Sequence, residues 1–138
     1  MIYGQPSLFE GAEGELVEVV SAPGYGLDAQ AALIHETAKE KGFWPNENYD
    51  FRSFHVSDNA IGCKLALVHS EITEILEAVR KNKGEQEVVE EMADVIIRLL
   101  DLYAALRNTG QVDSSLEDVL QLKMNKNALR PQLHGHKF

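Results

Sequence analysis

Two long segments of helical apolar periodicity, separated by a few polar residues, constrain the fold of this chain more than any other feature. Leucine, isoleucine and valine recur three and four residues apart over residues 57–82, and again over residues 86–106. Such spacing places the apolar side chains on one face of an α-helix. Because only a short turn at residues 81–85 connects the two segments, we expect two long helices that run antiparallel, side by side.

Two further helices are predicted on either side of this pair. Residues 28–41 form the first, with Asp28 as its N-cap, and residues 114–129 form the last, with Ser114 or Ser115 as its N-cap. Residues 46–56 are polar and irregular, which indicates an ordered loop. Short connections between long helices are typical of an all-α, antiparallel, four-helix-bundle-like fold.

The length of 138 residues corresponds to one domain. Residues 1–26 lack helical periodicity and predict a short extended N-terminal arm, whereas residues 27–138 contain all four helices and form the helical domain. No apolar run approaches the roughly 20 residues that cross a bilayer, and residues 1–10 carry no secretory-signal pattern. With a single cysteine, Cys63, these features predict a cytoplasmic protein.

The charge of the chain excludes some classes of partner. There are 22 acidic against 13 basic residues, a formal net charge of -9. This charge repels the phosphate backbone of nucleic acids and the surface of anionic membranes. We therefore expect neither a nucleic-acid polymer nor a membrane as partner.

Four carboxylates in the two long helices form two pairs with the same three-residue spacing. Glu71 and Glu74 share one edge of the second helix, and Glu91 and Asp94 share one edge of the third. Glu74 is about as far before the turn as Glu91 is after it, so antiparallel packing brings all four to one level. One such pair alone is common on a solvated helix face, which is the competing interpretation.

Carboxylates that converge in this way repel one another unless a cation lies among them. Oxygen ligands favour Mg²⁺, with Mn²⁺ as a substitute, and Mg²⁺ in proteins commonly bridges carboxylates and phosphates. We predict that this set binds Mg²⁺ and that the chemistry is phosphoryl or nucleotidyl transfer to water. The predicted metal ligands are Glu71, Glu74, Glu91 and Asp94.

The segments 64–74 and 90–94 resemble the ExxE…ExxD signature of the MazG-like, all-α nucleoside triphosphate pyrophosphohydrolases, which include dCTP pyrophosphatases and relatives of the dimeric dUTPases. The resemblance implies an enzyme that hydrolyses a (deoxy)nucleoside triphosphate to the monophosphate and pyrophosphate, by attack of water on the α-phosphorus. Glu71 and Glu74 are then the expected catalytic carboxylates, and Glu90 is a candidate general base.

Two further segments extend the resemblance to residues that would contact the substrate. Lys123 and Asn127 match the KxxxN segment of the family, which implies that Lys123 and the nearby Arg130 bind phosphates and that Asn127 bonds to sugar or phosphate. His35 and Trp44 have the nine-residue offset of a His and a Trp that line the base pocket in dCTP pyrophosphatases. The nucleoside triphosphate substrate is therefore expected to contact His35, Trp44, Lys123, Asn127 and Arg130.

Two positions depart from relatives. Ser70 stands where some members have a glutamate that can act as base, and Arg98 stands where dCTP-specific enzymes have an aromatic residue. The general base and the base selectivity therefore stay open. Arg98 lies four residues after Asp94, which favours an ion pair within the helix over a phosphate contact.

Other interpretations of function and assembly remain beside this one. A related pyrophosphohydrolase acting on another substrate, such as phosphoribosyl-ATP, has the same signature, and a catalytically silent dimerisation or nucleotide-sensing module has the same helices. The third helix carries apolar residues around more than half of its circumference, which predicts burial by another subunit. We expect a homodimer or homotetramer, in which the N-terminal arm or residues 123–130 enter the neighbouring pocket.

Overall fold

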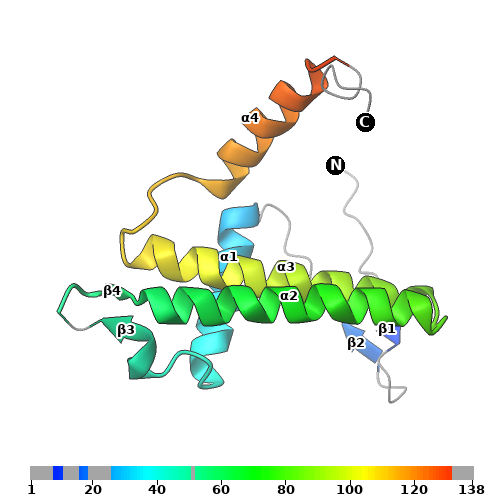
Figure 1. Cartoon of the computed structure of the whole chain (residues 1–138), viewed down its shortest axis with the longest axis horizontal. Helices are drawn as coiled ribbons and strands as arrows, with labels where there is room; N and C mark the ends of the chain where they lie inside the picture. The colour runs from blue at the N-terminus through cyan, green and yellow to red at the C-terminus, as the bar shows by residue number, and fades with distance from the viewer. Residues whose placement is uncertain (1–7, 11–15, 19–25, 51, 132–138) are drawn as a thin grey trace.

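The computed structural model shows a predominantly helical chain (Figure 1). The residues it describes are 8–10, 16–18, 26–50 and 52–131. The helices are α1 (Leu27–Glu40), α2 (Asp58–Arg80), α3 (Glu85–Asn108) and α4 (Leu116–Ala128). The all-α class is confirmed, and each helix begins and ends within about two residues of its predicted limits.

Residues outside the helices form two small antiparallel sheets. Strand β1 (Leu8–Glu10) pairs with β2 (Leu16–Glu18), and these two strands lie within the predicted arm. After α1, a short 3-10 helix at Asn46–Asn48 leads into β3 (Tyr49–Asp50), which pairs with β4 (His55–Val56). The predicted ordered loop thus contains a small hairpin. The domain boundary after residue 26 remains a prediction.

Helices α2 and α3 form the expected antiparallel hairpin, lying side by side over their lengths (Figure 1). The Ser57 hydroxyl begins α2 by accepting a hydrogen bond from the amide of Ala60 at 3.1 Å. The turn ends at Gly84, whose φ of 107° is one that side-chain-bearing residues rarely adopt. This tight turn fixes which residues of α2 lie opposite which residues of α3.

Both clusters of buried residues lie in one half of this hairpin. Helix α1 crosses α3, and the small side chains of Ala31 and Ala104 pack there against Leu100. A second cluster packs Trp44 and Val56 against α2 and α3. All buried residues of α3 fall within positions 100–105. The half of the hairpin nearer the turn is therefore left largely uncovered by the rest of the described chain.

Helices α1 and α4 cap each other at their N-termini. The Asp28 carboxylate accepts hydrogen bonds from the Ser115 hydroxyl at 2.6 Å and from the Leu116 amide at 3.0 Å, and Glu117 accepts one from the Asp28 amide at 2.8 Å. Burial raises the pKa of Asp28, but hydrogen bonds from Ser115, Tyr103 and the two amides outweigh burial and hold that pKa below its ordinary value. This reciprocal cap anchors the start of α4.

Beyond its first turn, α4 departs from the position that a compact four-helix bundle would give it. Every residue from Asp118 to Ala128 is exposed, and the helix rises away from α2 and α3 (Figure 1). Three helices thus form the core, and α4 is attached to them at one end. In the described part of the chain, no helix combines the length and the apolarity that crossing a bilayer requires.

Candidate active site

The antiparallel register brings carboxylates of α2 and α3 together. Glu71 of α2, and Glu91 and Asp94 of α3, each have one oxygen within 4.8 Å of the others. Glu74, the fourth predicted ligand, is exposed one turn beyond Glu71 and lies near enough for its charge to act on Glu91. The short turn that connects the helices sets the positions of the two carboxylate pairs along the hairpin.

The electrostatics of this cluster favour a bound cation. Burial raises the pKa of Glu91, and the negative charges of Glu74, Asp94 and Glu71 raise it further. A divalent ion among these oxygens would remove both penalties. The donor set consists of carboxylate oxygens, which suits Mg²⁺ or Mn²⁺ and does not suit zinc, whose ligands are mainly nitrogen and sulfur.

Glu90, the candidate base, lies outside this cluster. It is exposed, and its carboxylate accepts a hydrogen bond from the Gln86 side-chain amide at 2.9 Å. Neighbouring positions on a helix differ by about 100° in direction. Glu90 therefore points to a different side of α3 from Glu91.

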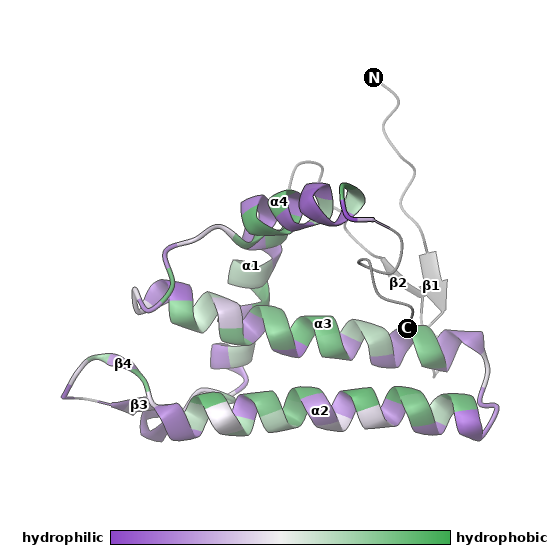
Figure 2. Ribbon diagram, turned by 45° about the horizontal axis from the view of Figure 1, so that its top comes forward, coloured by the Kyte–Doolittle hydropathy of each residue, from purple (hydrophilic) through white to green (hydrophobic). Residues whose placement is uncertain are grey.

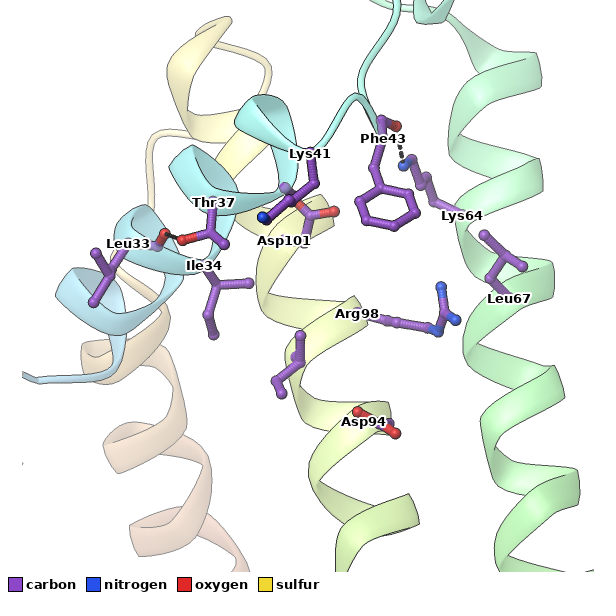
Figure 3. Close-up of a pocket in the computed structure, with 12 residues that line it drawn as sticks. Leu33, Ile34, Thr37, Lys41, Phe43, Lys64, Leu67, Asp94, Arg98 and Asp101 are labelled. Carbon is purple, nitrogen blue, oxygen red and sulfur yellow. Dashed lines mark hydrogen bonds between the residues drawn. The ribbon is translucent and has the colours of Figure 1, made fainter. Parts of the chain in front are cut away.

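Arg98 pairs across the hairpin. Its Nε lies 2.6 Å from Oε1 of Glu71, and its side chain extends from α3 towards α2 (Figure 3). In the described part of the chain its ionic partner is Glu71 and not Asp94. The predicted pair with Asp94 is therefore wrong, because the guanidinium reaches the neighbouring helix.

A pocket of about 530 Å³ lies beside the cluster, between α1, α2 and α3 (Figure 3). It is lined by Leu33, Ile34, Thr37, Ala38, Lys41, Phe43, Lys64, Leu67, Asp94, Ile97, Arg98 and Asp101. Asp94 and Arg98 belong both to this lining and to the surroundings of the carboxylate cluster. The pocket and the cluster are therefore continuous.

His35 and Trp44 lie one layer behind this lining, where both are buried. Nδ1 of His35 is 2.7 Å from Oδ1 of Asp101, and the Trp44 indole donates to both Asp101 oxygens at 2.9 Å. The two rings meet edge to face, with centroids 5.0 Å apart. Asp101 itself reaches the pocket, so the two predicted base-pocket residues orient a carboxylate of its wall. Their direct contact with a base remains a prediction.

Lys64, Phe43 and Asp101 also line the pocket, and no role was predicted for them from the sequence. The Lys64 ammonium donates to the Phe43 carbonyl at 2.7 Å and lies 4.1 Å from the Trp44 ring centre. Burial lowers the pKa of Lys64. Periodicity contains a signal for two of them: Lys64 is seven residues before Glu71, and Asp101 is seven after Asp94, so each shares a helix edge with a predicted ligand.

The three C-terminal candidates lie apart from the cluster. Lys123 and Asn127 are exposed on α4, and Arg130 is exposed just beyond its end. Because α4 rises away from α2 and α3 (Figure 1), these three residues do not join the pocket of their own chain. Their contact with phosphate or sugar remains a prediction.

The fold and the site together define an all-α protein in which a helical hairpin holds a carboxylate cluster at the edge of an apolar pocket. The family model of the MazG nucleotide pyrophosphohydrolase domain matches residues 63–134, more than half of the sequence. The chain belongs to this family, as the resemblance predicted. No curated protein and no solved structure matches the chain significantly.

Proposed function

We propose that this protein is a Mg²⁺-dependent hydrolase that converts a (deoxy)nucleoside triphosphate into its monophosphate and pyrophosphate. The observation that supports this most directly is the continuity between the carboxylate cluster and the pocket, through Asp94 and Arg98. A nucleotide has the matching two parts, a polyanion that needs cations and a flat base that needs an apolar cleft. Membership in the MazG family supports the same reaction class.

The residues of the pocket suit the nucleoside part of such a substrate. A volume of about 530 Å³ lies within the range of small-molecule sites. Leu33, Ile34 and Ile97 supply apolar walls, while Asp101 and Lys64 offer a fixed acceptor and a fixed donor to the edge of a base. The identity of the base is left open by this pairing, since every canonical base presents both kinds of group.

The carboxylates suit the triphosphate end of the substrate, where the reaction takes place. Glu71, Glu74, Glu91 and Asp94 would hold the metal, which when bound neutralises phosphate charge and lowers the pKa of a coordinated water. By holding the metal, these residues would position the α-phosphorus beside the pocket. Glu90 would act as general base only from another side-chain position, because its carboxylate bonds to Gln86 on a different side of α3 from Glu91.

The products test the reaction. Attack on the α-phosphorus releases pyrophosphate and a monophosphate, whereas a γ-phosphatase releases orthophosphate. In ¹⁸O-labelled water, with Mg²⁺ and a panel of canonical and modified dNTPs, we expect the label in the monophosphate. Label only in pyrophosphate would place the attack at the β-phosphorus. No turnover of any dNTP, with phosphoribosyl-ATP also assayed, would favour a nucleotide-sensing module.

We also propose that the active form is a homodimer or homotetramer. The half of the hairpin nearer the turn exposes Leu76, Val79 and Ile96 by more than half of their surface, and α4 exposes Leu122 by 68%. Apolar residues extend along both long helices and α4 (Figure 2). Exposed apolar patches of this extent mark interfaces, and a second copy would also bring Lys123, Asn127 and Arg130 within reach of a neighbouring cluster.

Sedimentation equilibrium at micromolar concentration tests this assembly. We expect a species of at least twice the 15.4 kDa chain mass. Leu122→Lys should shift the equilibrium towards monomer, because it introduces a charge into the apolar surface of α4, whereas Gln121→Lys adds the same charge at an adjacent polar position. A folded, active 15.4 kDa species would contradict the proposal.

A further inference from the structure

Arg98 lies where the carboxylate cluster meets the pocket, and it already neutralises one member of the cluster. Its Nε is 2.6 Å from Oε1 of Glu71, and Glu71 also supplies one of the three oxygens that lie within 4.8 Å of one another. The same arginine lines the pocket beside Asp94 (Figure 3). A metal ion and the guanidinium would therefore interact with the same Glu71 carboxylate.

We propose that Arg98 is a built-in counter-ion, which holds Glu71 in the empty site and transfers to a phosphate oxygen when substrate binds. This inference rests on the proposed function and adds to it a coupling between metal binding and triphosphate binding. Because the transfer frees Glu71, metal binding and triphosphate binding strengthen each other. Thermodynamic linkage requires that this effect be equal in both directions.

The physical chemistry of the pair supports a transfer. Arginine stays charged at every physiological pH, so it cannot yield to a metal ion by losing a proton and must move or repel it. Its side chain is 39% exposed, whereas that of Glu71 is 13% exposed, so the arginine is the partner with room to move. A guanidinium also matches phosphate oxygens with two parallel hydrogen bonds, whereas the pair with Glu71 uses Nε.

The alternative is that this ion pair only fastens α2 to α3. Both roles predict some loss of stability when Arg98 is replaced. They differ in the effect of the replacement on metal affinity. If the pair only fastens the helices, replacing Arg98 leaves the metal affinity unchanged or lowers it. If Arg98 is a counter-ion that competes for Glu71, removing its charge raises the metal affinity.

The first measurement is Mn²⁺ binding to the full chain by calorimetry, without nucleotide. We expect Arg98→Gln to bind Mn²⁺ about fivefold more tightly than wild type, the scale of one partly solvated charge interaction. Arg98→Lys, which keeps the charge, should remain near wild type. Arg80→Gln is the matched control, since Arg80 is an exposed arginine of the same hairpin that pairs with Glu77, and it should not change the affinity.

The second measurement uses the 1:1 complex of Mn²⁺ with inorganic tripolyphosphate, which carries the phosphates of a nucleotide without a base. We expect Arg98→Gln to bind this complex about tenfold more weakly, the usual effect of losing a charge-assisted hydrogen bond, and Arg98→Lys to lie between. Opposite shifts for the two probes support the transfer.

The results separate this inference from the proposed function. If wild type binds Mn²⁺ and Arg98→Gln leaves both affinities unchanged, or shifts both in one direction, Arg98 is not a transferring counter-ion and the proposed function stands. If neither wild type nor Arg98→Gln binds Mn²⁺, both proposals fail. Far-ultraviolet circular dichroism checks folding, and if Arg98→Gln is unfolded, Arg98→Met gives the same comparison without the charge.

Discussion

Replacing Glu91 by glutamine is expected to lower pyrophosphate release by on the order of 100-fold or more, because a metal ligand contributes several kcal/mol to stabilising the transition state. The substitution keeps the shape of the side chain and removes one charge from the cluster of Glu71, Glu91 and Asp94. Asp94→Asn should have a similar effect, and excess EDTA should abolish turnover of the wild-type chain.

Thermal unfolding separates this loss from damage to the fold. The folded state raises the pKa of Glu91, so the ionised carboxylate is disfavoured there at neutral pH, and Glu91→Gln without metal should melt at or above the wild-type temperature. Mg²⁺ should raise the melting temperature of wild type more than that of the variant, because an ion that binds only the folded state stabilises it.

The pH dependence of the Mg²⁺ effect has a definite sign. A carboxyl whose pKa is raised by folding binds its proton more tightly in the folded state, so the repulsion is absent at acid pH and grows as the pH rises through that pKa. The stabilisation by Mg²⁺ should therefore be larger at pH 7 than at pH 4. Glu77→Gln, which removes a charge paired with Arg80 and Lys81, is the control.

Near wild-type turnover in Glu91→Gln would show that the cluster is not the metal site.

The sequence determines the hairpin and the level of its carboxylates because both follow from local rules. Apolar periodicity defines α2 and α3, and a short turn forces them to be antiparallel. Nearly equal distances from that turn match Glu74 with Glu91 and Glu71 with Asp94, and the structure brings Glu71, Glu91 and Asp94 together. Two helix beginnings were equally predictable, since Ser57 and Ser115 cap as their side-chain chemistry predicts. The predicted N-cap of the first helix was wrong, because α1 begins at Leu27 with Gly26 as its N-cap and Asp28 lies in its first turn.

The position of α4 and the partners of individual side chains were harder to predict from the sequence. The position of α4 depends on the reciprocal cap between Asp28 and Glu117 and on surfaces that the described chain leaves exposed. Arg98 has carboxylates within reach on two helices, and periodicity alone could not decide between Asp94 and Glu71. The burial of Asp101 depends on Trp44, which reaches it from a loop whose path has no repeating pattern.

The second large effect that we expect is a loss of stability when the buried Asp101 is replaced. Asp101→Leu should lower the free energy of unfolding by about 3 kcal/mol, because the buried donors that it satisfies would lose their acceptor. Those donors are the Trp44 indole and the His35 ring, both buried. Asp101→Asn keeps one acceptor oxygen, and the His35 ring can change tautomer to meet the new amide, so its cost should be about 1 kcal/mol.

Urea denaturation at one fixed protein concentration measures these losses, since an oligomer's stability depends on concentration. Asp118→Leu makes the same replacement at an exposed position of α4 and should change the free energy of unfolding by less than about 0.5 kcal/mol. Wild-type stability of Asp101→Leu would mean that water or another group satisfies the two donors.

A double-mutant cycle with Trp44→Phe identifies the cause. Phenylalanine retains a ring but has no N–H, so in that background Asp101→Leu leaves one fewer donor unpaired and should cost less than it does in wild type. The difference measures the interaction of the indole with the carboxylate, whose two hydrogen bonds are each 2.9 Å long. Strictly additive losses would assign the stability of this layer to apolar packing, and the orientation of Asp101 at the pocket wall would then depend on His35 alone.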